Sequence, residues 1–208
     1  MKRLTLLVLT ISCLYFGCGE EYSDKPQESS RILAEPYPND SPYTPDSRKL
    51  EEFPIAHRPY QSFTSGIRRF GAARGGGSRL HAAADLYSSV GNAVRAVSSG
   101  IITDYYYFYS GTYAAVIEHT MANGSKRVVR YGEISGFANG FAVGSRVHGG
   151  DTFARIGKLN CCSPMLHFEY FEGTLSGPLT TNAGPFRRRS DLLNPNQLLL
   201  RLYDEAGY

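Results

Sequence analysis

From residue 63 onward, the chain is a series of short runs of β-branched and aromatic residues separated by Gly and Asn. Such runs favour strands, and the residues between them favour turns. No segment shows a long helical period. The pattern therefore predicts a mainly β domain, built as a compact antiparallel sheet or sandwich. The expected strands cover 93–97, 100–102, 105–109, 113–119, 127–134, 152–156 and 166–171, and a short helix is expected over 190–200.

Residues 1–17 have the features of an export signal. Two basic residues precede an apolar stretch over 4–16, which is too short to span a bilayer as a helix. Gly17 and Cys18 follow, and a small residue before a cysteine is typical of a bacterial lipobox. We therefore expect Cys18 to be the lipid attachment site, which would tether the protein to a membrane surface. A lipobox at Cys13, plain secretion and an uncleaved anchor are the alternatives.

Residues 18–62 are predicted to be a flexible linker. Seven prolines lie between residues 19 and 60, mixed with Ser, Asp, Glu and Tyr. Few apolar residues are available there to form a core. The prediction divides the chain into a signal peptide over 1–17, this linker, and one domain over 63–208 that includes a C-terminal extension.

Charge and cysteine content limit the partners. The net charge is only +3, and the one basic run covers 187–189, so no nucleic-acid partner is predicted. If the signal peptide contains Cys13 and lipid consumes Cys18, only Cys161 and Cys162 remain in the domain. Adjacent cysteines seldom pair with each other and are too close in sequence for a usual zinc-thiolate site. We expect no disulfide, and a small apolar or loop role for both.

The segment from His81 to Asp85 is a candidate half of a metal site. In an extended strand, alternate residues share one face, so this histidine and this carboxylate would point the same way. The spacing alone is weak, and a surface histidine with a turn aspartate is the alternative. The segment 165–169 also alternates, which places His167 on one face of a distant strand. Three ligands of this kind leave one position of a zinc ion open, as in catalytic sites.

Several motifs, all in the same order, resemble those of the lysostaphin and LytM type of zinc metallopeptidase. They are Phe70 with Gly71, Arg79 to His81, Asp85 with Leu86, Val94 to Val97, Gly100 with Ile101, Val116 to His119, Tyr131, Gly150 with Asp151, Ile156 with Gly157, and Leu166 to Glu169. The resemblance covers roughly 66–173. It implies a lysostaphin-like β fold, a zinc ion held by His81, Asp85 and His167, and hydrolysis of peptide cross-links in peptidoglycan.

Two positions depart from this family's pattern. Glu133 stands two residues after Tyr131, where the family usually has a histidine, and Met165 replaces the first histidine of a His-x-His motif. Those histidines normally act beside the zinc ion, and a thioether cannot take a proton at neutral pH. Losing a positioned acid–base group typically lowers a rate by about 10²- to 10⁴-fold.

Two functional hypotheses follow. In the first, the protein is a zinc endopeptidase and Glu133 is its general base, as glutamate is in other zinc peptidases. In the second, the domain is catalytically silent and binds peptidoglycan or regulates a cell-wall hydrolase. A surface position for Glu133 and an unrelated sugar-binding β domain are the remaining alternatives.

The expected location follows from the signal and the resemblance together. We expect an exported protein of the cell envelope, lipid-anchored at an outer membrane or on the periplasmic face. Its expected partners are peptidoglycan, the membrane through the N-terminal lipid, and, under the second hypothesis, a cell-wall hydrolase.

Overall fold

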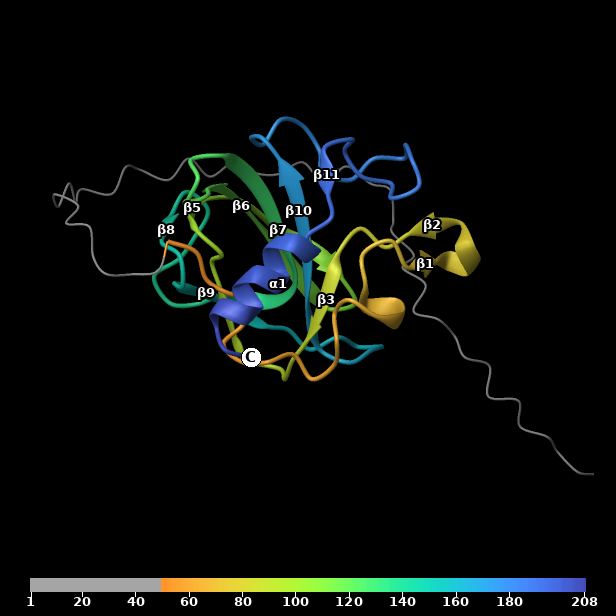
Figure 1. The fold of residues 1–208 in the computed structure, drawn as a ribbon, viewed down its shortest axis with the longest axis horizontal. Coiled ribbons are helices and arrows are strands. Elements are labelled where there is room, and N and C mark those ends of the chain that lie inside the picture. The colour runs from red at the N-terminus through yellow and green to blue at the C-terminus, as the bar shows by residue number, and fades with distance from the viewer. Residues whose placement is uncertain (1–49) are drawn as a thin grey trace, which may run out of the picture.

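The computed structural model describes residues 50–208, which form a mainly antiparallel β structure with one α-helix (Figure 1). The predicted fold class is therefore confirmed. The signal peptide, Cys18 and most of the predicted linker lie outside the described residues. Within the described residues, no helix is both long and apolar enough to cross a membrane.

One sheet of nine strands organises the described residues. Its strands are β3 (Ala84–Tyr87), β4 (Ala93–Arg95), β5 (Ser99–Tyr109), β6 (Thr112–Thr120), β7 (Lys126–Phe137), β8 (Arg146–Val147), β9 (Thr152–Ile156), β10 (Met165–Glu172) and β11 (Leu192–Leu193). The main order is β11-β10-β7-β6-β5-β8, while β3 pairs with β10, and β9 pairs with both β4 and β7. β7 and β10 are neighbours in this order, and β10 also pairs with β3. Residues of β3, β7 and β10 therefore lie close to one another.

The remaining elements are small. They are a separate two-stranded ribbon of β1 (Ala73–Arg74) and β2 (Arg79–Leu80), the 3₁₀ turns η1 (Gly66–Arg68) and η2 (Gly75–Gly77), and the helix α1 (Asn196–Glu205). The helix was expected over 190–200 but begins later. Residues 192–193 pair with β10 instead, and Pro195 caps the helix start, where its missing N–H costs nothing.

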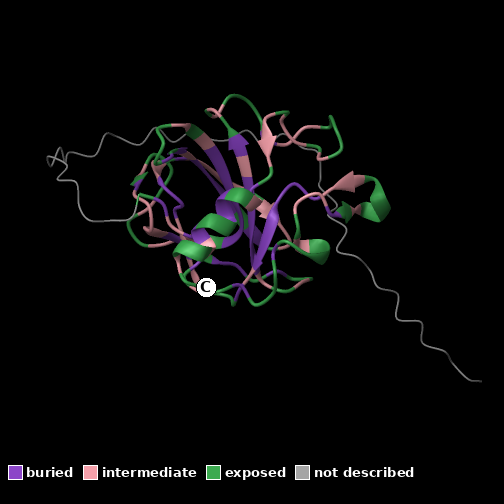
Figure 2. Ribbon diagram, in the orientation of Figure 1, coloured by how far each residue is buried: buried purple, intermediate pink, exposed green. Residues whose placement is uncertain are grey.

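The strands separate two apolar clusters. The larger core includes Tyr131 and Phe168, and α1 packs Leu198, Leu199 and Leu202 against it. The smaller cluster consists of Val116, Val128, Phe171 and Leu179. Figure 2 shows buried strands behind a helix whose outer side is exposed. Because neighbouring strand residues point to opposite faces, His167 and Glu169 lie on the face of the smaller cluster, away from Phe168.

The folded region begins before the predicted boundary at residue 63. Phe53 and Ile55 are almost completely buried, although they flank a proline within the predicted linker. Isolated bridges join Glu51 to Ser98 and Ile55 to β4. Both apolar side chains belong to the core, and composition alone could not show this among the surrounding prolines.

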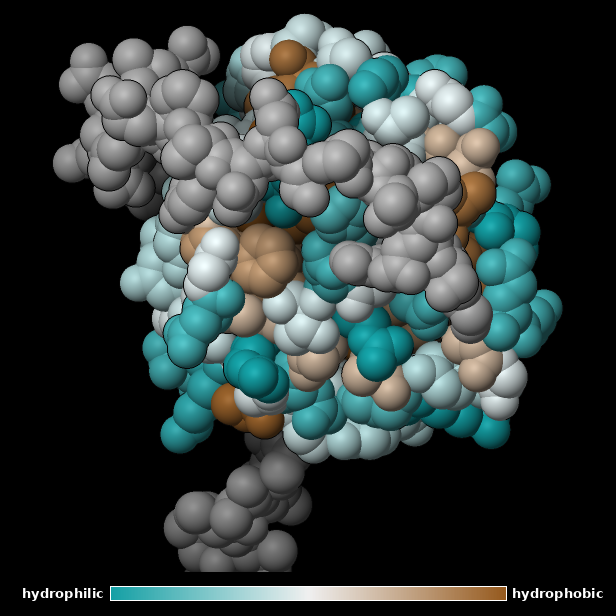
Figure 3. Space-filling model, turned by 90° about the vertical axis from the view of Figure 1, so that its left-hand side faces the viewer, coloured by the Kyte–Doolittle hydropathy of each residue, from teal (hydrophilic) through white to brown (hydrophobic). Residues whose placement is uncertain are grey.

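The surface on the side of β5, β8 and β9 is chemically mixed. Figure 3 shows hydrophilic and hydrophobic residues interspersed over the described part of that face. β5 is a single long strand and not the two expected over 100–102 and 105–109, because its pairing with β6 continues through an irregularity between Ile102 and Asp104.

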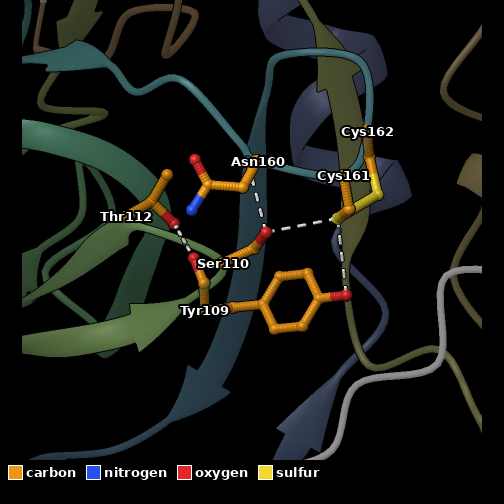
Figure 4. Close-up of a disulfide and its surroundings, with 6 residues drawn as sticks. All are labelled: Tyr109, Ser110, Thr112, Asn160, Cys161 and Cys162. Carbon is orange, nitrogen blue, oxygen red and sulfur yellow. Dashed lines mark hydrogen bonds between the residues drawn. A yellow bond between two sulfur atoms is a disulfide. The ribbon is translucent and has the colours of Figure 1, made fainter.

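Cys161 and Cys162 form a disulfide in the loop that joins β9 to β10 (Figure 4). The predicted loop position is correct, but the expectation that the two would not pair was wrong. The Ser110 hydroxyl group donates to Cys161 Sγ over 3.3 Å, and the Tyr109 hydroxyl oxygen lies 3.6 Å from the same atom. The loop is also held to the β5–β6 turn by the Asn160 N–H, which donates to the Ser110 carbonyl.

Candidate metal centre

The structure brings together the three residues that the sequence predicted as zinc ligands. Asp85 on β3 is directly opposite His167 on β10, and His81 directly follows β2. Asp85 Oδ1 lies 3.0 Å from His167 Nδ1 and 3.1 Å from His81 Nε2. The two imidazole nitrogens are 3.4 Å apart. All three side chains are buried, and their ligand atoms lie within 4.8 Å of one another.

The second nitrogen of each imidazole has its own partner. His81 Nδ1 is 3.0 Å from the Arg69 carbonyl oxygen, and His167 Nε2 is 2.9 Å from Glu169 Oε1. Both partners can only accept, so each of these ring nitrogens must carry a hydrogen. His81 Nε2 and His167 Nδ1 are then the ring nitrogens that face Asp85. Two imidazole nitrogens and one carboxylate oxygen oriented in this way fit a zinc ion.

The electrostatics of the cluster favour a bound cation. Burial alone would raise the pKa of Asp85, but hydrogen bonds with His167 and His81 hold it well below its ordinary value. Burial alone would lower the pKa of His167, but hydrogen bonds to Asp85 and Glu169 raise it to about 10. A second cation, the Arg74 guanidinium, lies 3.3 Å from Asp85 Oδ2. A metal ion would replace the proton that His167 otherwise holds between two carboxylates.

Glu169 is fully buried and contacts two arginines. Arg188 approaches Glu169 Oε1 with Nη2 at 2.9 Å, and Arg130 forms a short ion pair with the other carboxylate oxygen. Burial would raise the pKa of Glu169, but the charges of Arg130 and Arg188 hold it well below its usual value. Glu169 therefore remains an ionised acceptor for His167. A support of this kind fixes the orientation and tautomer of a ligand histidine.

Glu133 occupies an unusual backbone position next to the cluster. Gly132 is paired with His167, and the pairing of β6 with β7 shifts between Tyr113 and Ala115, which produces a bulge at Gly132 and Glu133. Glu133 has φ of 66°, in the left-handed region that non-glycine residues seldom adopt. It is 5% exposed, so the alternative of a surface carboxylate is wrong.

Tyr87 is influenced by the charges of both Asp85 and Glu133. Burial, then the charge of Asp85 and a smaller contribution from Glu133, raise the pKa of Tyr87, while Arg68 opposes the shift. Met165 is directly opposite Tyr87 on β10 and is almost fully buried. Since it lies two residues before His167, it shares that residue's strand face, and its role as a groove-lining residue stays a prediction.

Sequence reasoning missed Phe108 and the arginines. The Phe108 ring centre is 5.4 Å from that of His167 and 5.2 Å from the guanidinium carbon of Arg130. A side chain at Gly132 would collide with this ring, because an added Cβ would lie 2.7 Å from it. A glycine within a β-rich run was the available signal, since such a residue often marks a bulge or a close approach.

Comparison with known proteins identifies the fold. No family model matches the chain, and no curated protein matches it. Among solved structures, the antimicrobial peptidase lysostaphin from Staphylococcus simulans has a TM-score of 0.53 at 22% identity, over 77% of this chain and 56% of that one. LytU has a TM-score of 0.50 at 19% identity, over 72% of this chain and 97% of that one. The described domain therefore has the fold of the lysostaphin-type peptidases, as the resemblance implied.

Proposed function

We propose that this protein is a zinc-dependent endopeptidase that hydrolyses peptide cross-links of peptidoglycan. The observation that carries the proposal is the orientation of the ligand set. His81 and His167 each use one ring nitrogen to donate to a fixed acceptor, while the other faces Asp85. Supports of this kind orient ligand histidines, and here they direct His81 Nε2 and His167 Nδ1 at the same carboxylate oxygen.

Each residue has a separate task in this proposal. When bound, zinc supplies Lewis-acid polarisation of a scissile carbonyl and of water. His81, Asp85 and His167 hold the ion, and Arg74 holds the second oxygen of Asp85. Glu133 is the general base, because a carboxylate can take a proton whereas Met165 cannot. The left-handed backbone of Glu133 supports such a role, since strained residues cluster at functional sites.

A second candidate function is a catalytically silent domain that binds peptidoglycan or regulates a cell-wall hydrolase. Met165 and Glu133 favour it, because they replace the two histidines usual in the family that the sequence resembles. An anionic side chain can accept a proton but cannot stabilise negative charge that develops on the substrate. The intact ligand set favours the first function, because a silent domain has no evident need for it.

The proposed cellular context comes from the N-terminal residues. We propose that residues 1–17 direct export, that Cys18 carries the lipid, and that the following segment tethers the domain to the membrane. The chain would then act in the cell envelope, at an outer membrane or on the periplasmic face, without a nucleic-acid partner.

The test is product release from purified peptidoglycan sacculi. The protein would be produced from residue 19 onward, so that it remains soluble, and loaded with zinc. Peptide fragments that disappear in the His167→Ala variant and in a chelated sample would support the endopeptidase, and Glu133→Gln would then test the base. Folded, zinc-loaded protein that releases no peptides, yet sediments together with sacculi, would favour the silent binding domain.

A further inference from the structure

The chain between β10 and β11 forms a small hairpin over 179–189, which we call the 179–189 hairpin. The Arg189 N–H donates to the Leu179 carbonyl over 3.0 Å, and the Thr181 N–H donates to the Arg187 carbonyl over 3.1 Å. A turn at Gly184, whose φ is 69°, reverses the chain. In Figure 1 this blue segment extends from β10 toward β2.

One side of this hairpin reaches the support of His167. Arg188 contacts both oxygens of Glu169 with Nε, at 3.0 and 3.1 Å, and its Nη2 is 2.9 Å from Oε1. Oε1 is also the atom that accepts from His167 Nε2. Arg188 therefore holds the oxygen that determines which nitrogen of His167 carries the hydrogen.

The hairpin also touches the other cation that holds Glu169. Thr180 Oγ1 accepts from Arg130 Nη1 over 2.9 Å, so both arginines of the buried carboxylate depend on residues 179–189. Without Arg188, no arginine among the described residues would contact Oε1, the oxygen that accepts from His167, because Arg130 pairs with Oε2.

The tip of the hairpin reaches the support of the other histidine. The Leu80 N–H donates to the Pro185 carbonyl over 2.7 Å, immediately before His81. The Phe186 ring stacks on Phe70, with centres 4.7 Å apart and planes 23° apart. Phe70 directly follows Arg69, whose carbonyl accepts from His81 Nδ1.

We propose that the 179–189 hairpin is a brace for the metal centre and that Arg188 is a positioning residue for it. The inference rests on the proposed zinc site. The two ligand histidines come from distant parts of the chain. The same short hairpin holds Glu169, the partner of His167, and contacts Leu80 and Phe70, which adjoin His81 and its partner Arg69. Supports of this kind typically change metal affinity by about 10- to 100-fold.

The test measures zinc affinity by competition with a chromophoric chelator, using the soluble chain from residue 19. Arg188→Gln is expected to bind zinc at least about tenfold more weakly than wild type, and Arg188→Lys to recover part of the loss. Arg187→Gln is the matched control, because that neighbouring side chain is exposed. It is expected to bind like wild type.

A spectroscopic measurement separates positioning from a general loss of structure. In ¹⁵N-edited NMR of the zinc-loaded protein, the His167 Nε2–H should exchange slowly with water in wild type and rapidly in Arg188→Gln. Phe186→Ser breaks the ring stack and leaves the buried ion pairs in place, so it tests the second contact in a variant that keeps the Glu169 network. It is expected to weaken zinc binding severalfold.

The outcomes distinguish the two proposals. Wild-type zinc affinity in Arg188→Gln and Phe186→Ser, with an unchanged His167 signal in Arg188→Gln, would overturn the brace and leave the endopeptidase proposal intact. Wild-type protein that binds zinc but releases no peptides would overturn the endopeptidase, while the affinity losses would still support the brace. A wild-type chain that binds no zinc would overturn both.

Discussion

The Tyr131 hydroxyl group donates a hydrogen bond to Nε2 of His119 over 2.9 Å, inside the sheet. The direction follows from the other partners. His119 Nδ1 faces the Ser98 carbonyl at 2.8 Å and must carry the hydrogen, and the Val97 N–H donates to the Tyr131 oxygen. His119 is therefore a buried neutral histidine with a structural role.

This pair predicts how stability depends on pH. Burial lowers the pKa of His119 from 6.5 to about 4, although hydrogen bonds to the backbone oppose the shift. Between these values the unfolded chain binds a proton that the folded chain does not, so the free energy of unfolding falls as the pH is lowered from about 6.5 to about 4. The loss from this group is at most about 3 kcal/mol.

Urea unfolding of the metal-free protein at pH 5 and pH 7 measures this effect. The comparison with His119→Gln isolates the contribution of His119. It is needed because His167 has a raised pKa, so its contribution to the free energy of unfolding is greatest at low pH and changes with pH in the opposite direction. The variant should be less stable at pH 7 but should lose less stability on acidification. An equal loss in both proteins would contradict the prediction.

Zinc is expected to stabilise the fold through the predicted ligands. An ion that binds only the folded state at 100 times its dissociation constant adds about 2.7 kcal/mol to the free energy of unfolding. For a domain of this size that corresponds to a rise in Tm of roughly 5 to 10 °C. Differential scanning calorimetry with and without zinc should show the rise in wild type. Asp85→Ala and His167→Ala should show none, whereas His148→Ala, which changes a histidine outside the cluster, should keep it.

The fold was more predictable than the supports of the site. Alternating apolar residues marked most strands because alternation is a local property of the chain. His81, Asp85 and His167 could be found because their spacing belongs to a known motif. Arg188 and Phe108 could not, since each reaches the site through contacts across strands or from a loop far away in sequence.

Other features lacked a sequence signal for a different reason. Gly132 could have indicated a bulge, but glutamate does not mark a left-handed position as glycine does, so nothing indicated the backbone conformation of Glu133. The disulfide between Cys161 and Cys162 contradicts a rule that holds for most adjacent cysteines. Phe53 and Ile55 were two apolar residues among prolines, and only the structure shows that the core has room for both.

Close packing at Gly132 is expected to respond to a single methyl group. Gly132→Ala would place a Cβ 2.7 Å from the Phe108 ring, which must then move away from its position beside His167. Overpacking of this kind typically costs about 1–3 kcal/mol. Phe108→Leu in the same chain should relieve part of the clash, so the two losses measured by urea unfolding should be less than additive. Strict additivity would show that the ring and the new methyl group do not collide.

Restoring the two missing histidines tests whether the scaffold is competent for catalysis. Glu133→His with Met165→His would supply an imidazole at each position where this chain has departed from the family pattern. If the zinc site is intact, cross-link hydrolysis by the double variant should exceed that of wild type by about 10²-fold or more, since a positioned acid–base group contributes about 10²- to 10⁴-fold. The measurement is peptide release from sacculi, with a triple variant that adds His167→Ala as the control for metal dependence. A double variant that binds zinc as tightly as wild type yet releases no peptide would mean that the groove itself no longer admits a cross-link, and the binding function would then be the better account of this domain.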